Sequence, residues 1–158
     1  GIANAIDCAK HYCHGGPVAV CLGDNWFADG DMEFIASRIA QFTSGCEFWV
    51  KEVPDPSDYG VLELSASGQP VAVIEKPEVP PSPFAVIGMY LFDSQVWDVI
   101  ANLTPSKRGE YEVTDLITWY LRRGEAKYHK LTGAWYDLGR SLDNYLRISY
   151  LIHGEGEL

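Results

Sequence analysis

Residues 17–25, PVAVCLGDN, decide the fold class of this chain. The apolar run from Pro17 to Leu22 is bounded by Gly16 and Gly23. An apolar run of this length between turn residues is typical of a strand that is buried on both faces, as strands are in a parallel sheet. We therefore expect residues 17–22 to form a strand inside a sheet that is covered by helices.

Strand-like and helix-like segments alternate on both sides of this run. Strand composition is found in residues 47–53, 59–65, 70–77, 85–92 and 126–131, and helical spacing in residues 2–9, 34–42, 94–103, 113–121 and 142–152. Ser141 is expected to cap the last helix, with Leu142, Tyr145, Leu146 and Ile152 on its inner face. The alternation predicts an α/β fold: one domain over residues 1–158, with a mixed, mostly parallel sheet flanked by helices.

The composition restricts the classes of partner. Twelve basic residues stand against 22 acidic ones, a net charge of -10, and a field of that sign makes general nucleic-acid binding improbable. A phosphorylated small molecule remains possible because one or two local cations can outweigh a distant field. No apolar run approaches the ~20 residues of a membrane span, and the start has no signal-peptide layout, so we expect a cytoplasmic protein.

Two aspartates stand at predicted strand ends. Asp24 directly follows the strand at residues 17–22, and Asp137 lies in AWYDLG at another predicted strand-to-helix junction. In an open α/β sheet, ligands bind in the crevice beyond the carboxyl ends of strands. The two carboxylates could converge there on one Mg²⁺, although each alone could equally be a turn or cap residue.

Further polar groups stand at or between the other strands. Lys76 offers a compact charge for a phosphate and Glu75 can accept hydrogen bonds from sugar hydroxyls, but the two could also form an ordinary exposed ion pair. Gly60 and Gly88 interrupt strand-like stretches, which often marks the close approach of a ligand or another backbone. Arg108 could bind phosphate or simply be solvated.

An ordered series of motifs covers nearly the whole chain. The motifs are Gly23-Asp24-Asn25, Lys51-Glu52-Val53-x-Asp55-Pro56, Tyr59-Gly60-Val61, Glu75-Lys76-Pro77, Gly88-x-Tyr90, the run PSKRGEYEVTD at residues 105–115, and Trp135-x-Asp137-x-Gly139. This series resembles the sugar-1-phosphate nucleotidyltransferases, whose fold is Rossmann-like, and the run at residues 105–115 looks most like the glucose-1-phosphate thymidylyltransferase branch.

The resemblance implies an activity and a set of site residues. The family uses Mg²⁺ to transfer a nucleoside monophosphate from a triphosphate to a sugar 1-phosphate, releasing pyrophosphate; this branch implies dTMP and glucose 1-phosphate. The implied residues are Asp24 and Asp137 for the metal, Glu75 and the backbone at Gly60 and Gly88 for the sugar, Lys76 and Arg108 for its phosphate, and Tyr59, Tyr90 and Trp135 beside the substrate.

The chain departs from the family pattern in one respect. No stretch matches the glycine-rich G-x-G-T-R-L-x-P loop, which cradles the triphosphate and supplies the catalytic arginine and lysine. The resemblance therefore implies the sugar-phosphate-binding half of such an enzyme, with no catalytic residue of its own. We expect a separate nucleotide-binding chain or a homo-oligomer, and a binding module or a structural remnant remain the alternatives. The residues present do not decide which base and which sugar are used.

Overall fold

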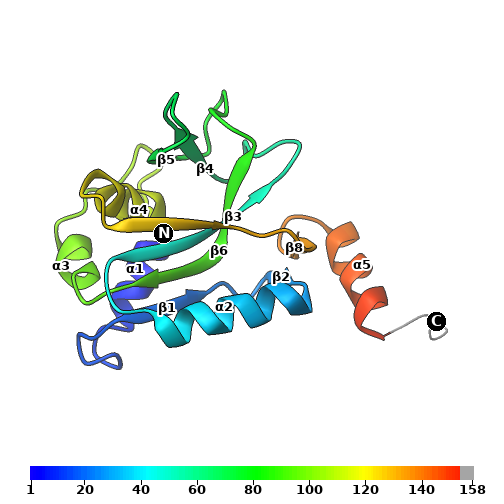
Figure 1. Cartoon of the computed structure of the whole chain (residues 1–158), viewed down its shortest axis with the longest axis horizontal. Helices are drawn as coiled ribbons and strands as arrows, with labels where there is room; N and C mark the ends of the chain where they lie inside the picture. The colour runs from blue at the N-terminus through cyan, green and yellow to red at the C-terminus, as the bar shows by residue number, and fades with distance from the viewer. Residues whose placement is uncertain (154–158) are drawn as a thin grey trace.

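A computed structural model describes residues 1–153 of the chain, except the side chain of residue 152 (Figure 1). The elements in order are α1 (Ile2–Cys8), β1 (Val18–Cys21), β2 (Asn25–Phe27), α2 (Asp29–Gln41), β3 (Cys46–Glu52), β4 (Gly60–Leu64), β5 (Pro70–Glu75), β6 (Phe84–Phe92), α3 (Val96–Ala101), α4 (Val113–Arg122), β7 (Ala126–Lys130), β8 (Trp135–Asp137) and α5 (Leu142–His153). Each segment expected from the sequence forms the expected type of element. Within residues 1–153, no helix combines the length and the apolar character needed to cross a membrane.

A six-stranded sheet forms the centre of the molecule. Its strands follow the order β5-β4-β6-β3-β7, and β1 also pairs with β6. β2 and β8 form a separate two-stranded sheet in which Asn25 is paired with Asp137. The small sheet therefore brings the residue after Asp24 next to the second aspartate predicted to bind metal.

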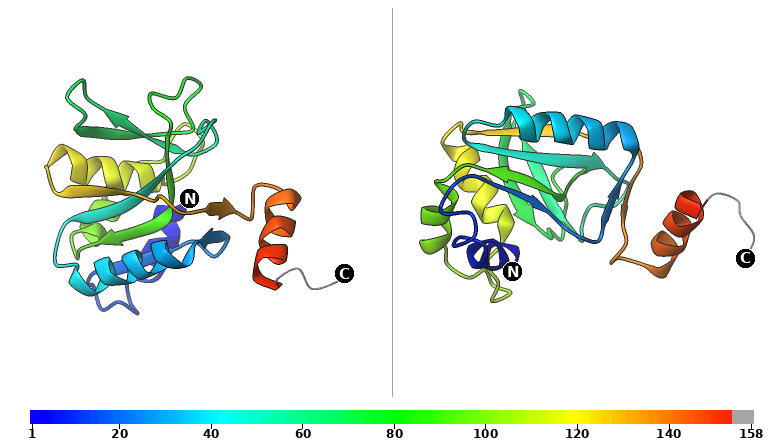
Figure 2. Two further views of the ribbon diagram at one scale, coloured as in Figure 1. Left: turned by 45° about the vertical axis from the view of Figure 1, so that its right-hand side comes forward. Right: turned by 90° about the horizontal axis from the view of Figure 1, so that it is seen from below.

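Helices cover both faces of the large sheet (Figure 2). Side chains alternate between the faces of β3, so that Phe48 and Val50 join a core with α1, α3 and α4, while Trp49 joins a second core with Ile35 of α2. This period of two is the geometry of any strand, and here both faces are apolar because both are covered. The expected α/β class, a mixed sheet flanked by helices, is confirmed.

The expected majority of parallel strand pairs is wrong. Among the described strands only β3 and β7 pair in parallel, and every other pair is antiparallel. β6 accounts for most of the difference, because it runs opposite to β1, β3 and β4. An apolar run does not distinguish parallel from antiparallel neighbours. The strand expected at residues 17–22 is β1, and the expectation that it is buried on both faces is also wrong. Its residues are alternately half-buried and exposed, because β1 pairs with β6 alone among the strands of residues 1–153 and lies at an edge of the sheet.

Helix α5 corrects a second expectation. Ser141 caps it as predicted, accepting a hydrogen bond from the Asn144 backbone N–H at 3.2 Å. However, Leu142, Tyr145 and Leu146 are 71%, 55% and 42% exposed and do not form an inner face, and the side chain of Ile152 lies outside the described residues. Figure 1 shows the reason, because α5 stands beside the molecule beyond β8 with no sheet beneath it.

A buried charge cluster ties α2 to the sheet. Glu47 on β3 is only 4% exposed, accepts two hydrogen bonds from Arg38 at 2.6 and 2.9 Å, and lies 2.8 Å from His129 Nε2 on β7. Burial alone would raise the pKa of Glu47, but the hydrogen bonds to Arg38 and His129 outweigh burial and hold the pKa below its ordinary value. The folded state therefore stabilises the charged form of the Glu47 carboxylate.

Replacing Glu47 by glutamine is expected to lower the free energy of unfolding by about 2–3 kcal/mol, because Arg38 then loses its partner. Glu47 stabilises the fold above its unfolded-state pKa, and this contribution is lost as the pH falls through its lower folded-state pKa. The difference between wild type and variant should thus shrink as the pH falls below the ordinary glutamate pKa of about 4.3. Urea unfolding of both proteins at several pH values measures this difference in the free energy of unfolding. Glu52→Gln is the control, because Glu52 is an exposed residue on the same strand. Equal stability of the two variants at pH 7 would contradict the prediction.

Candidate functional site

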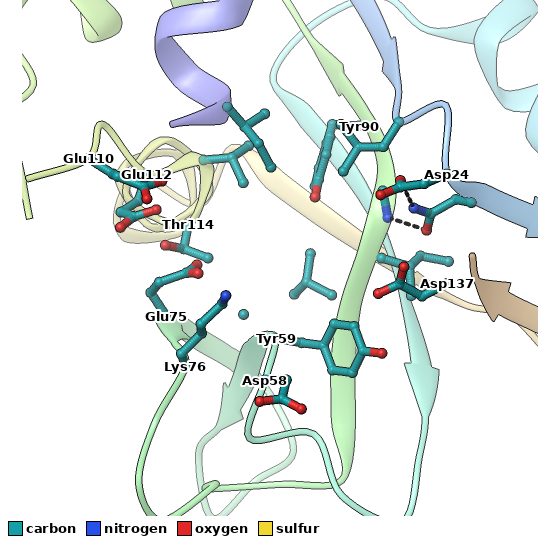
Figure 3. Close-up of a pocket in the computed structure, with 18 of the residues that line it drawn as sticks. Asp24, Asp58, Tyr59, Glu75, Lys76, Tyr90, Glu110, Glu112, Thr114 and Asp137 are labelled. Carbon is teal, nitrogen blue, oxygen red and sulfur yellow. Dashed lines mark hydrogen bonds between the residues drawn. The ribbon is translucent and has the colours of Figure 1, made fainter. Parts of the chain in front are cut away.

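The candidate site lies where two strands diverge along one edge of β6. β3 pairs with one edge of β6, while β1 pairs with residues 89–92 and β4 with Ala85 on the other edge. Among the strands of residues 1–153, none flanks residues 86–88 on that second edge. A cavity of about 240 Å³ opens at this place (Figure 3).

All ten residues predicted for the site line this one cavity. They are Asp24, Tyr59, Gly60, Glu75, Lys76, Gly88, Tyr90, Arg108, Trp135 and Asp137. Their positions come from separate parts of the chain, and the fold brings them together. The role that the resemblance implies for each residue remains a prediction.

The two aspartates face one glycine. The Leu138 backbone N–H donates to the Asp24 carbonyl at 2.7 Å, which holds the two strand ends together. A Cβ atom placed on Gly139 would lie 2.9 Å from Asp24 Oδ2 and 3.4 Å from Asp137 Oδ1. Both carboxylates therefore border the small space that the missing side chain leaves free. Hard oxygen ligands around such a space fit Mg²⁺, which is usually held by one or two carboxylates, waters and substrate phosphates.

Within residues 1–153, no group of three or more His, Cys, Asp or Glu side chains is arranged to hold a metal. Asp24 and Asp137 are thus a pair without a third protein carboxylate. A pair of this kind suits an ion that is also bound by a phosphorylated ligand, and it does not suit a closed structural site.

Asn25 orients Asp24 and was not assigned a role from the sequence. Its Nδ2 donates to Asp24 Oδ1 at 2.9 Å, and its Oδ1 accepts from the Gly88 N–H at 3.1 Å and from Trp135 Nε1 at 2.8 Å. One amide thereby connects the carboxylate with β6 and β8. The only signal in the sequence was its place beside Asp24 in the Gly23-Asp24-Asn25 motif.

Glu75 and Arg108 belong to an acidic cluster at one end of the cavity. Arg108 donates to Glu75 at 3.0 Å, to Glu110 at 3.3 Å and to Glu112 at 3.5 Å, so its charge is shared by three carboxylates. Burial is the main cause that raises the pKa of Glu75, followed by the charge of Glu112. The sequence did not show that the arginine predicted for phosphate would be surrounded by acidic groups.

Lys76 has a strained backbone and points into the cavity. Its φ of 41° lies in the left-handed region that a lysine rarely occupies, and its N–H donates to the Tyr59 carbonyl at 2.9 Å. Figure 3 shows its side chain directed into the cavity. Strain at a residue that carries the ammonium group into a pocket is typical of functional sites.

The two glycines serve mainly as points of close packing. A Cβ atom on Gly60 would lie 2.5 Å from Thr114 Cγ2, and one on Gly88 would lie 2.7 Å from the Leu22 Cβ. The Gly88 carbonyl already accepts from the Leu22 N–H, and its N–H donates to Asn25. Close approach of neighbouring protein groups therefore accounts for both glycines.

Aromatic side chains form the walls. Tyr59 and Trp135 pack edge to face with ring centroids 5.5 Å apart. Tyr90 is 3% exposed, and Figure 3 shows its hydroxyl group directed into the cavity. Burial, followed by the charges of Glu75 and Asp24, raises the pKa of Tyr90 well above its ordinary value. Tyr90 therefore stays protonated and can donate a hydrogen bond to a ligand.

Replacing Tyr90 by phenylalanine is expected to weaken ligand binding by about tenfold, because one hydrogen bond to the ligand is lost. The fold should tolerate the change, since the ring remains in the core. Titration calorimetry with glucose 1-phosphate measures the affinity. The matched control is Tyr12→Phe, because Tyr12 is 82% exposed and lies outside the cavity. An unchanged affinity of the Tyr90 variant would show that its hydroxyl group does not touch the ligand.

The cavity as a whole is acidic. Two cationic side chains line it, Lys76 and Arg108, against six carboxylates: Asp24, Asp58, Glu75, Glu110, Glu112 and Asp137. A phosphate group would be repelled by this set unless a bound cation offset the charge. A phosphorylated ligand would therefore need a cation beside it to offset the charge of these carboxylates.

Comparisons with known proteins agree on one family. The family model for nucleotidyl transferases matches residues 1–154. A glucose-1-phosphate thymidylyltransferase from Actinoplanes is 40% identical over 96% of this chain and 50% of its own length. The protein of the same name from Mycolicibacterium smegmatis is 37% identical over 88% of this chain and 49% of its own. The chain thus spans about half the length of these curated relatives.

Solved structures share the fold. A crystal structure from Bacillus anthracis, assigned as a glucose-1-phosphate thymidylyltransferase and containing sucrose, has a TM-score of 0.83 and 34% identity, covering all of this chain and 63% of that one. A UDP-glucose pyrophosphorylase with bound UDP-glucose has a TM-score of 0.80 and 23% identity, covering 97% of this chain and 62% of that one. This second likeness concerns the fold alone.

Proposed function

The chain belongs to the nucleotidyl transferase family, and on that basis we propose that it is the sugar 1-phosphate-binding part of a sugar-1-phosphate nucleotidyltransferase. One observation carries the proposal. The same cavity is lined by a lysine, by a pair of aspartates around a small space, and by hydrogen-bonding groups suited to a sugar. The lysine, Lys76, forms no ion pair within the described residues 1–153. Glucose 1-phosphate has the matching chemistry, since it combines hydroxyl groups with one phosphate.

Different groups around the cavity take different parts of this ligand. Glu75 accepts hydrogen bonds from sugar hydroxyls, and Tyr90 donates one. Lys76 binds the phosphate, whereas Arg108 can do so only by leaving its three carboxylates. Gly60 and Gly88 allow the walls to approach closely.

Mg²⁺ fits the remaining part of the site. Asp24 and Asp137 would hold it, and bound there it would offset the negative charge of the phosphates. The chain's own contribution is to bind the sugar phosphate, to orient its phosphate oxygen and to exclude water from one side. In the proposed reaction this oxygen forms a bond to the α-phosphorus of a nucleoside triphosphate, the bond from that phosphorus to the bridging oxygen breaks, and pyrophosphate leaves.

The finer substrates are dTTP and glucose 1-phosphate in this proposal. The thymidylyltransferases at 37–40% identity support them, and epimeric sugars or other bases would use the same chemistry. Because these residues match about half of those relatives and include no stretch resembling G-x-G-T-R-L-x-P, we propose that turnover also requires a nucleotide-binding segment that these residues do not supply. Association of two copies of this chain is the other arrangement that we propose.

A binding module without turnover is the second candidate. The cavity residues are all present, while the sequence lacks a match to the loop for the triphosphate. Such a module would hold a sugar phosphate or a nucleotide-sugar and would release no pyrophosphate.

Calorimetry with glucose 1-phosphate, with and without Mg²⁺, tests the proposal. We expect binding that strengthens with Mg²⁺, and no detectable binding at millimolar ligand would refute it. Pyrophosphate release from dTTP and glucose 1-phosphate, after a chain carrying the glycine-rich loop is added, then separates the two candidates. Release supports the enzyme, and binding without release supports the binding module.

A further inference from the structure

Arg140 lies outside the cavity but contacts one of its walls. It stands in the turn after β8 and reaches back to residues that precede it by more than 80 positions. Its Nη1 donates to the Tyr59 hydroxyl group at 2.9 Å, and its Nη2 donates to Asp58 Oδ2 at 2.9 Å. Arg140 is not among the residues that line the 240 Å³ cavity, whereas Asp58 and Tyr59 are, but it lines an adjoining pocket that shares Asp24, Lys76 and Asp137 with that cavity.

We propose that Arg140 is a positioning residue of the candidate site, which holds the Tyr59 ring in place against Trp135 and beside Asp137. This inference rests on the proposed function. It concerns a residue for which the family resemblance implied no role, and it assigns Arg140 no direct contact with the ligand.

The guanidinium group suits this task. Its two terminal nitrogens form a planar fork, and the fork meets two acceptors that lie on neighbouring residues, Asp58 and Tyr59. Its central carbon also lies 5.1 Å from the centroid of the Tyr59 ring. A lysine has one nitrogen at its end and cannot reproduce a two-pronged contact, so arginine fixes the tyrosine more firmly.

Tyr59 connects several parts of the site, so its position matters. Its ring packs on Trp135, whose Nε1 donates to Asn25, and Asn25 in turn donates to Asp24. Its backbone carbonyl accepts from the Lys76 N–H.

The ion pair itself contributes little. The side chains of Arg140 and Asp58 are 38% and 66% exposed, and an ion pair this exposed to solvent adds little to the stability of the fold. The value of the contact therefore lies in restricting Tyr59 before the ligand arrives, which reduces the entropy lost on binding.

A double-mutant cycle tests the inference. Arg140→Met is expected to weaken Mg²⁺-dependent binding of glucose 1-phosphate by about tenfold without changing the melting temperature. In a Tyr59→Phe background the same change should have almost no further effect, because the hydroxyl contact is already lost. Arg140→Lys should recover only part of the affinity. Arg147→Met, which removes the same charge from an exposed position on α5, is the control.

Three binding results would overturn the inference: an unchanged affinity of Arg140→Met, effects of Arg140→Met and Tyr59→Phe that add, or a loss that Arg147→Met reproduces. Additive effects would show that Arg140 binds the ligand directly. A crystal structure of Arg140→Met gives a readout that needs no ligand. We expect the Tyr59 ring to leave Trp135 there, and a ring that stays in place would refute the inference even if glucose 1-phosphate does not bind. Absence of binding by wild type would refute the proposed function instead.

Discussion

Replacing Asp137 by asparagine is expected to remove the Mg²⁺-dependent part of glucose 1-phosphate binding, a loss of about 100-fold in affinity at millimolar Mg²⁺. The change keeps the shape of the side chain, and the asparagine Oδ1 can still accept the hydrogen bond that Gly139 N–H donates at 3.0 Å. The charge is lost, and with it one of two carboxylates around the space at Gly139. A neutral amide oxygen binds a hard cation more weakly than a carboxylate does, because it carries no net charge.

Calorimetry at several Mg²⁺ concentrations measures this effect. Asp143→Asn is the matched control, because it removes the same charge from an exposed position in the first turn of α5. Wild type and Asp137→Asn should have the same melting temperature without Mg²⁺. An affinity of Asp137→Asn that still rises with Mg²⁺ as in wild type would place the metal elsewhere.

Replacing Lys76 by asparagine is expected to weaken glucose 1-phosphate binding by about 100-fold while leaving the fold as stable as before or slightly more stable. The two effects have separate causes. The ligand loses the cation that points into the cavity, whereas the backbone at φ 41° accepts asparagine more readily than lysine. Loss of binding with unchanged stability would mark Lys76 as a residue kept for its charge despite its strain.

Lys107→Asn is the control for this second prediction. Lys107 is exposed in the loop next to Arg108 and does not line the cavity. Calorimetry and thermal unfolding of both variants check the prediction, and inorganic phosphate serves as a competitor that reports on the phosphate subsite alone. Binding of both anions by Lys76→Asn as in wild type would assign the phosphate to another cation.

Most of the cavity could be located from the sequence. Most of the residues named there were expected at strand ends or within strands, Arg108 was expected in a loop, and the family resemblance implied that they share one site. Asp24 and Asp137 are the clearest example. They are separated by more than 100 positions, yet each was assigned to the crevice by its place after a strand, and both border Gly139.

The residues that orient the cavity could not be located in this way. The partners of Asn25 lie 63 and 110 residues away, and those of Arg140 lie 81 and 82 residues away. A hydrogen bond between distant segments leaves no local pattern, so an amide or a guanidinium group in a turn looks like an ordinary solvated residue. Glu110 and Glu112 stand two and four positions after Arg108, but the sequence contained no sign that Arg108 would also reach Glu75, 33 positions before it.

The run PVAVCLGDN shows where this boundary lies. Its apolar composition and its flanking glycines determined by themselves that a strand forms and that Asp24 follows it. Both signals are local, because they depend only on neighbouring residues in the chain. Only the tertiary structure decided that β1 pairs with β6 and runs antiparallel to it; within residues 1–153, β1 pairs with no other strand. The cavity opens where β1 and β4 separate along β6. Strand direction and neighbours depend on distant hydrogen bonds, and the apolar pattern of one segment is the same whichever partner it meets.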